Sequence, residues 1–394
     1  MPTVHRKPNF AAAVAFVNGL RDADTGGSAS VPGGPATLYG TCYALLTRYY
    51  LDPTTAPDER ETRFILDCQD EQTGLFIGPE LAGHHPGPDE KFDREHLLLH
   101  LACATLPVLR QWNIAPRHRL GFAERFCDLD ELARWLEARD MTRAWLEGNN
   151  LLFVGQLLVD LRDHEKHPAA AAALAAWFDW LDRTVDPATG LWGSDGKCSH
   201  FAAMAGGYHQ LLVYYHEGHP INAPRKLVDT VLDLQHADGG FAPGGGGGAC
   251  EDVDAIDILV NLYKRQDYRR ADIRAALRHA LGHLRRMQNP DGGFVYKRDQ
   301  PHTHMGIPHT DVPPNTSAMF PTWFRVHTLA LIAEVLTDEP ALAGRPFQFN
   351  RACSMGWHKT WDRAAHRISR AERMREFPKT ARLGLRRLAA AFKP

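Results

Sequence analysis

The chain has 394 residues, which is long enough for one large domain or two ordinary ones with a sizeable core. Its formal net charge is -2, so the overall charge offers no attraction to nucleic acid, and no nucleic-acid partner is expected. The seven cysteines include no CxxC pair, which argues against a disulfide framework and favours a cytoplasmic location.

The first predicted helix covers residues 10–20, FAAAVAFVNGL, and is expected to be folded rather than a signal peptide because no clear cleavage site follows. No apolar run reaches the roughly 18 residues of a membrane-spanning helix. Helical spacing of apolar residues recurs in REHLLLHLACATLPVLRQW, NNLLFVGQLLVDLRDH, EDVDAIDILVNLYKR and IRAALRHALGHLRRMQ. No segment alternates convincingly as a strand would, so the sequence predicts an all-α fold.

A turn motif recurs between the predicted helices. It is strict in LQHADGGF and MQNPDGGF and weaker in RDADTGG, CQDEQTGLF and TVDPATGLW. Its glycines, which suit turns that need a positive φ, are Gly26, Gly74, Gly190, Gly239 and Gly292. Most steps are about fifty residues, and the double step after Gly74 predicts a hidden degenerate repeat. About six helical hairpins fit between residues 8 and 340.

The pattern QxxDGGF, at Gln235–Phe241 and Gln288–Phe294, resembles the repeat turn of the squalene-hopene cyclase and protein prenyltransferase superfamily. The resemblance covers residues 15–340 and is strongest over 180–340. It implies an α/α toroid, in which an inner and an outer ring of helices surround a cavity. Squalene-type cyclases normally use two such barrels, whereas this chain has room for one.

The octapeptide CEDVDAID after the first strict turn places four carboxylates within one short stretch. It resembles the DxDD region of class II terpenoid cyclases, which implies that Asp254 is the proton donor and Asp252 the first Asp of the motif. The next Asp of that motif falls on Ala255. Glu251 and Asp257 lie one helical turn from Asp254 and would tune its acidity, because clustered carboxylates resist joint ionisation. The plainer alternative is a set of acids that stabilises a helix N-terminus.

The predicted inner helices begin with polar and aromatic residues that would line the cavity. The candidates for substrate binding on these helices are Tyr43, His96, Asn150, His209, Trp323 and His327. Any one of them could instead cap a helix or fill the core. Aromatic rings suit carbocations, whereas histidine and asparagine beside such rings also suit sugars, and the fold alone does not choose between these ligands.

A long loop, residues 299–317, separates the last strict turn from the last inner helix. It contains two further candidates for substrate binding, His309 and Asp311, together with His302 and His304. HxH and HxD patterns can bind metal, but the prolines favour a lid over the cavity. No metal site and no cofactor are predicted, with Mg or Zn as the alternative.

After Asp362 the composition becomes basic, and Pro378 divides the tail into two helical pieces. We therefore predict a toroid domain over residues 1–345 and a basic, amphipathic C-terminal extension over residues 346–394. The extension suits an anionic membrane surface or a partner, and packing on the barrel is the alternative. The predicted location is cytoplasmic, with a peripheral membrane location as the alternative.

These observations give one leading hypothesis and three alternatives. The leading one is a terpenoid-cyclase-like enzyme that protonates an isoprenoid through Asp254 and forms a carbocation. The second is a carbohydrate-active toroid, a lyase, epimerase or hydrolase that acts on a uronate-containing glycan or a glycolipid. A zinc prenyltransferase-like enzyme would use Cys250, Asp252 and His327, although the spacing of Cys250 and Asp252 does not match. A non-catalytic binding toroid is the last alternative.

Overall fold

The computed structural model describes residues 7–87, 90–342, 347–360 and 374–376. It confirms the predicted all-α class. The α-helices are α1 (Phe10–Gly19), α2 (Leu38–Leu51), α3 (Glu59–Asp67), α4 (Arg94–Gln111), α5 (Leu129–Glu137), α6 (Ala144–Asp163), α7 (Ala170–Thr184), α8 (His200–Glu217), α9 (Pro224–Asp233), α10 (Ala249–Arg265), α11 (Arg270–Leu284) and α12 (Met319–Val335). The short elements are β1 (Ser28–Ala29), β2 (Ala36–Thr37), β3 (His302–Thr303), β4 (Asp311–Val312), η1 (Gly121–Cys127), η2 (Met141–Arg143), η3 (Arg285–Met287) and η4 (His304–Gly306).

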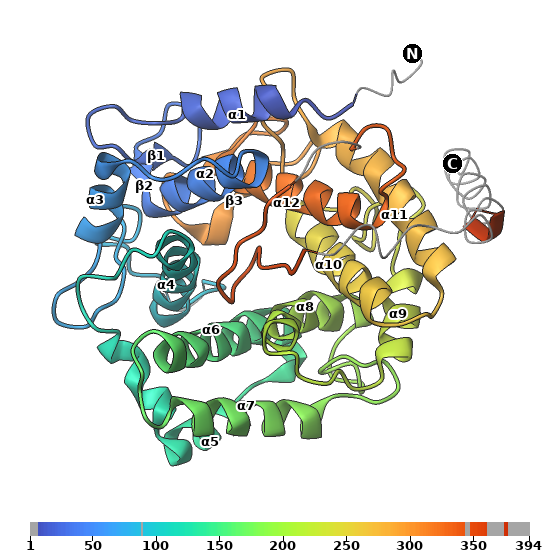
Figure 1. Cartoon of the computed structure of the whole chain (residues 1–394), viewed down its shortest axis with the longest axis horizontal. Helices are drawn as coiled ribbons and strands as arrows, with labels where there is room; N and C mark the ends of the chain where they lie inside the picture. The colour runs from blue at the N-terminus through green and yellow to red at the C-terminus, as the bar shows by residue number, and fades with distance from the viewer. Residues whose placement is uncertain (1–6, 88–89, 343–346, 361–373, 377–394) are drawn as a thin grey trace.

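The even-numbered helices form a closed inner ring. Each of α2, α4, α6, α8, α10 and α12 packs against the next, and α12 packs back against α2. The odd-numbered helices lie outside this ring, as Figure 1 shows. Outer and inner helices alternate along the chain, so the fold is an α/α toroid of six hairpins, as the sequence predicts.

The inner and outer helices differ in how much of their surface is buried. Inner helices such as α2 and α12 are buried on nearly every side, which explains why their apolar residues run all round the helix. Outer helices such as α3 and α5 bury one face only. Local caps set several helix starts: Asp58 and Glu61 form a capping box at α3, and Ser199 caps α8.

The recurring turns join each outer helix to the inner helix that follows. All five marker glycines have positive φ, between 76° at Gly190 and 101° at Gly239, as the sequence predicts. The hairpin of α5 and α6 is joined through η2 without such a glycine, so it is the degenerate repeat hidden in the double step.

The glutamine of the turn motif fastens neighbouring repeats together. Gln235 donates through Nε2 to the carbonyl of Gly239 at 3.1 Å and to that of Ala276 in α11 at 2.9 Å. Gln288 donates in the same way to Gly292 and to Asn9, which precedes α1, both at 2.9 Å. The second contact joins the last repeat to the first, so the same motif also helps to close the ring.

One end of the ring is closed by residues 347–358, which run across its middle in Figure 1. The backbone N–H of Gln348 donates to the carbonyl of Tyr50 at 3.1 Å, and that of Arg351 donates to Gln111 at 3.0 Å. The predicted boundary between residues 345 and 346 stays a prediction. Most of the basic extension, including the second predicted helical piece, lies outside the described residues; of the first piece the structure describes residues 374–376, where Glu376 forms an ion pair with Arg274 of α11.

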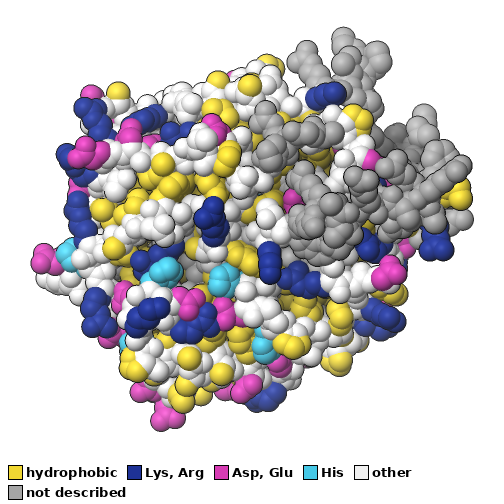
Figure 2. Space-filling view, viewed as in Figure 1, with side chains coloured by type: hydrophobic (Ala, Val, Ile, Leu, Met, Phe, Trp, Pro, Cys, Tyr) yellow, Lys and Arg dark blue, Asp and Glu magenta, His cyan; other side chains and the backbone are white. Residues whose placement is uncertain are grey.

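The described surface carries charges of both signs. On the face in Figure 2, basic and acidic side chains are interspersed and no single sign dominates, in keeping with the net charge of -2. Within the described ranges, no helix combines the length and apolar character needed to cross a bilayer.

The close approach at the strict turn can be tested with Gly239→Ala. A Cβ there would lie 2.5 Å from the backbone oxygen of His279, at a φ of +101°. We expect this variant to lose about 1–3 kcal/mol of unfolding free energy in urea titrations. The control is Gly33→Ala, which shares a positive φ of +75° but meets nothing within 4 Å. Equal losses in the two variants would contradict the steric explanation.

Candidate functional site

A cavity of about 450 Å³ lies inside the ring. Its wall combines aromatic rings with polar groups that the helix starts supply, and segment 347–358 contributes Met355. The wall also includes Lys91, His100, Trp145, Asn149, His209, Cys250, Asp254, Tyr296, His302, His304, Phe320 and Phe324. The cavity is therefore neither filled by side chains nor purely apolar.

Asp254 is the buried carboxylic acid of this wall. Its side chain is 1% exposed, and neither carboxyl oxygen has a hydrogen-bond partner among the described residues. Burial raises its pKa well above the ordinary value, and the nearby acids Glu251, Asp257 and Asp252 raise it further. The protonated form of Asp254 is therefore favoured at this cavity wall, and its role as a proton donor stays a prediction.

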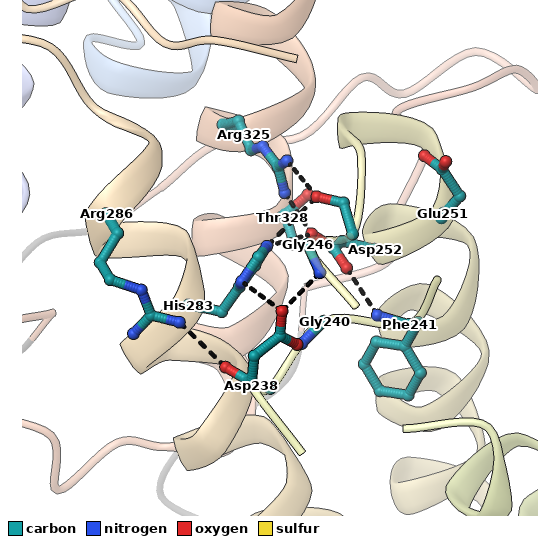
Figure 3. A network of polar contacts seen from close by, with 12 residues as sticks. Asp238, Gly240, Phe241, Gly246, Glu251, Asp252, His283, Arg286, Arg325 and Thr328 are labelled. Carbon is teal, nitrogen blue, oxygen red and sulfur yellow. Dashed lines mark hydrogen bonds and ion pairs between the residues drawn. The ribbon is translucent and has the colours of Figure 1, made fainter. Parts of the chain in front are cut away.

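Asp252 has a different environment on the same helix. Figure 3 shows it between Arg325 and His283, while Glu251 points away from this network. It forms a buried ion pair with Arg325, lies 3.3 Å from Nε2 of His283, and accepts from the backbone N–H of Phe241 at 3.0 Å. Burial alone would raise its pKa, but Arg325 and His283 outweigh that effect and lower it. Asp252 therefore stays ionised and fastens the DGGF turn to α10 and α12.

The other two predicted acids lie on either side of Asp254 along α10. Glu251 accepts from the hydroxyl of Tyr296 at 2.8 Å, and burial raises its pKa. Asp257 is fully buried and accepts from Asn261 at 2.9 Å, and burial raises its pKa to about 7. Both acids thus influence Asp254 through their charge, whereas it is Asp254 that lines the cavity.

His209 on α8 presents a basic nitrogen to the cavity. Its Nδ1 lies 2.7 Å from the carbonyl oxygen of Ala205. Because a carbonyl oxygen only accepts, Nδ1 carries the proton, and Nε2 keeps its lone pair. Burial lowers the pKa of His209 to about 4, so the ring is neutral at pH 7. His209 is therefore equipped to accept a proton.

His100 on α4 has the opposite orientation. The hydroxyl of Tyr39 lies 2.6 Å from its Nδ1, and burial raises the pKa of Tyr39 well above its usual value. The Tyr39 hydroxyl stays protonated and donates a hydrogen bond to Nδ1 of His100, since a buried donor without an acceptor is costly. His100, whose own pKa is lowered by burial, thus carries its proton on Nε2 and offers an N–H donor to the cavity.

Two of the predicted aromatic residues support the wall from behind. Tyr43 lies 3.2 Å through its hydroxyl from Nε2 of His304 and stacks on Trp323 at 4.6 Å between ring centroids. His304 in turn stacks on Phe320 at 3.9 Å. Tyr43 and Trp323 therefore position cavity residues without lining the cavity themselves.

The remaining predicted binding residues do not gather at this cavity. His96 and Asn150 bond to each other at 2.8 Å and line a second cavity beside the first. His327 is buried next to Tyr50 and Phe349, away from the wall. His309 and Asp311 are exposed on the predicted lid, whose residues 302–306 do line the cavity.

Several wall residues were missed as binding candidates. Trp145, Lys91 and Met355 come from segments without a repeat signal, and Tyr296 follows the second strict turn. A signal did exist for Arg325, because a lone arginine within the apolar helix FPTWFRVHTLALI implies a buried acidic partner.

The described residues contain no group of three or more His, Cys, Asp or Glu side chains arranged to hold a metal ion. In particular, Asp252 is bonded to Arg325, whereas Cys250 lines the cavity. The absence of a cofactor stays a prediction.

Comparisons with known proteins give few matches. No family model matches the sequence, and no curated protein matches it. Among solved structures, a polysaccharide lyase aligns over 84% of this chain and 98% of its own, with 14% identity and a TM-score of 0.46. Similarity at this level does not identify an activity, so a functional conclusion has to come from this chain's own residues. Membership of the squalene-hopene cyclase and prenyltransferase superfamily stays a prediction.

The different environments of Asp252, which is ion-paired, and Asp254, which is not, can be tested through protein stability. Asp252→Asn should lower the free energy of unfolding by about 3–5 kcal/mol, because it leaves the Arg325 charge buried and uncompensated. Asp254→Asn is the matched control on the same helix, and it removes no ion pair. Denaturant titrations of both variants beside the wild type measure the difference. Similar losses in the two would contradict the assigned charge states.

The same variants should differ in pH dependence. The folded pKa of Asp254 is raised, so the folded state binds a proton that the unfolded chain releases, and the contribution of Asp254 to wild-type stability falls as pH rises above about 4. The stability of Asp254→Asn relative to wild type should therefore increase with pH. The folded pKa of Asp252 is lowered, so its contribution is present above about 4 and is lost on acidification. Thermal unfolding across a pH series gives both slopes, and a flat difference for Asp254→Asn would contradict the raised pKa.

Proposed function

We propose that the protein is a carbohydrate-active enzyme that removes the proton next to the carboxylate of a uronate residue in a glycan. One observation carries the proposal. A neutral histidine base, His209, and a protonated acid, Asp254, line the same cavity as an N–H donor on His100 and an aromatic ring, Trp145. Ring faces and hydrogen-bonding groups together suit a sugar, which has both apolar faces and hydroxyl groups.

The uronate carboxylate needs donors, and the cavity supplies them. His100 presents its Nε2–H, and Asn149, which donates one hydrogen to the carbonyl of Trp145 at 3.0 Å, has a second to offer. Lys91 adds a positive charge, with its Nζ 5.4 Å from the ring centroid of Trp145. These groups would stabilise the negative charge that builds up on the carboxylate as the proton leaves.

The proposed elimination balances within this set of residues. Nε2 of His209 takes the proton from the carbon beside the carboxylate, and that electron pair forms the new carbon–carbon double bond. The bond from the neighbouring ring carbon to the glycosidic oxygen breaks, and Asp254 gives its proton to that oxygen. His209 is then cationic and Asp254 anionic, and transfer of one proton between them through water restores the resting state. An epimerase would use the same first step and return a proton to the other face.

Hydrolysis is less well supported than elimination. Glycosidases use a pair of carboxyl groups about 5–9.5 Å apart across the scissile bond. The carboxyl side chains that line the cavity among the described residues are Asp254 and the exposed Glu90. The wall thus offers one buried acid and several neutral imidazoles, which suits proton abstraction.

Isoprenoid cyclisation is the second candidate, and Asp254 is the observation that favours it. An unpaired, protonated acid in a cavity with Phe320, Phe324 and Tyr296 could protonate an alkene. The wall, however, also contains neutral imidazoles, and a base such as His209 would take a proton from a carbocation and end the cyclisation. This opposes the cyclase hypothesis more than Asp254 supports it. For either substrate class, the basic extension is proposed to bring the enzyme to a membrane or a partner.

Turnover tests the proposal directly. Purified protein would be incubated with polymers of galacturonate, glucuronate and mannuronate, and the unsaturated product followed by ultraviolet absorbance and mass spectrometry. His209→Ala and Asp254→Asn should each lower kcat/KM by about 10²–10⁴-fold, as expected for loss of a general base or acid. His200→Ala, which removes an exposed histidine from the same helix, is the control. Failure of all three polymers, combined with cyclisation of a linear isoprenoid, would replace this proposal by the cyclase.

The pH profile of kcat/KM should have two limbs. Activity should fall as pH drops through about 4, where His209 becomes protonated and can no longer act as a base. It should also fall on the high-pH limb, as pH rises through the raised pKa of Asp254. Glu251→Gln should move the high-pH limb to lower pH, because removing a nearby negative charge makes ionisation of Asp254 easier. A high-pH limb unmoved by Glu251→Gln would show that Asp254 does not set it.

A further inference from the structure

A second cavity of about 370 Å³ adjoins the first. Both are lined by Glu90, Lys91 and Leu146, so the two form neighbouring compartments. The second is markedly basic on one side. It is lined by the cations Lys91, Arg125, Arg139 and Arg143, together with Trp135.

The floor of the second cavity is a chain of fixed polar groups. Nδ1 of His96 donates to Oδ1 of Asn150 at 2.8 Å, and Nδ2 of Asn150 donates to Glu147 at 2.9 Å. Arg139 also donates to Glu147 at 2.9 Å and lies 4.1 Å from the ring centroid of Trp135. These contacts fix each group's orientation before any ligand arrives, which lowers the cost of binding.

One buried acceptor in this network of polar groups has no hydrogen-bond partner. His96 is 4% exposed, and its Nε2 has no hydrogen-bond partner among the described residues. Because Nδ1 donates to Asn150, Nε2 holds the lone pair, and burial lowers the pKa of His96 to about 4. A neutral acceptor at the wall of a cavity is suited to the hydroxyl group of a ligand.

The acids around the second cavity already have partners. Asp93 caps α4 by accepting from the N–H of His96 at 2.8 Å, and Glu90 accepts from the N–H of Gly87 at 2.9 Å. Glu95 forms an ion pair with Arg125.

Two of the cations remain available for a ligand. Arg139 is paired with Glu147, but neither Lys91 nor Arg143 is ion-paired with a carboxylate in the described part of the chain. Arg143 donates to the backbone carbonyl of Lys91 at 3.2 Å, which keeps the two basic residues together.

We infer that the second cavity is a binding subsite for a second acidic sugar residue of the glycan. This residue is linked to the sugar residue that occupies the first cavity. Arg143 and Lys91 bind its carboxylate, and Nε2 of His96 accepts from one of its hydroxyl groups. The inference rests on the proposed function for the identity of the polymer. It adds that the enzyme requires a chain of acidic residues rather than a single one.

Binding to the full-length protein, measured by calorimetry, tests the subsite separately from turnover. The probes are the monomers and dimers of galacturonate, glucuronate and mannuronate, with glucose and maltose as the neutral pair. At least one acidic dimer should bind about 10-fold more tightly than its monomer, the gain expected from a charge-assisted contact. Arg143→Gln and His96→Ala should each reduce that gain. Arg134→Gln, an exposed arginine of α5 that does not line the cavity, should preserve it.

The outcomes separate the two proposals. Turnover of acidic polymers with equal affinity for monomer and dimer would overturn the subsite and leave the proposed chemistry standing. A length-dependent gain that needs Arg143, in a protein that turns over none of the polymers, would support the subsite and overturn the chemistry. A gain of the same size from glucose to maltose, or no binding by any acidic probe, would overturn the subsite.

Discussion

The site depends on the buried ion pair between Asp252 and Arg325. Arg325 also donates to the carbonyls of Gly247 at 2.9 Å and Tyr296 at 2.7 Å, while Asp252 accepts from the N–H of Phe241. These contacts tie α10, α12 and the strict turn together at the wall of the cavity. A buried pair of this kind contributes little net stability but is costly to break, so it fixes geometry more than it adds energy. Asp254, two residues further along α10, lines this cavity.

Burial then decides which groups around the cavity are charged. Asp252 has a cationic partner, which lowers its pKa, whereas Asp254 has none and burial raises its pKa, which favours the protonated acid. The same desolvation keeps His209 and His100 neutral, and their fixed hydrogen bonds give them opposite proton positions. An acid whose protonated form is favoured, a neutral base and a neutral donor therefore line the same cavity. This combination suits proton transfer at a neutral pH, and it suits carbocation chemistry poorly because a base stands in the wall.

The repeat made the fold predictable from sequence, because each turn needs a glycine with positive φ and a glutamine that reaches the next repeat. It also placed Asp254 and His209 on inner helices, α10 and α8. The resemblance gave Asp252 and Asp254 different roles, but the sequence could not show that Asp252 is the acid that pairs with Arg325, which lies 73 positions away from it. Nor could it indicate Met355 or Lys91, which reach the cavity from segments outside the repeat. His327 fitted the helical pattern but lies away from the cavity, since adjacent turns of one inner helix face different neighbours.

The central claim is that Asp254 faces the cavity as a protonated acid at neutral pH. The most direct test is the infrared difference spectrum between wild type and Asp254→Asn at pH 7, recorded in H₂O and D₂O. We predict that the variant loses one carbonyl-stretch band of a neutral carboxylic acid, and that this band shifts in D₂O. Loss of a carboxylate band instead would show that Asp254 is ionised, and would contradict both its role as the acid and the pattern of charged and neutral groups around the cavity.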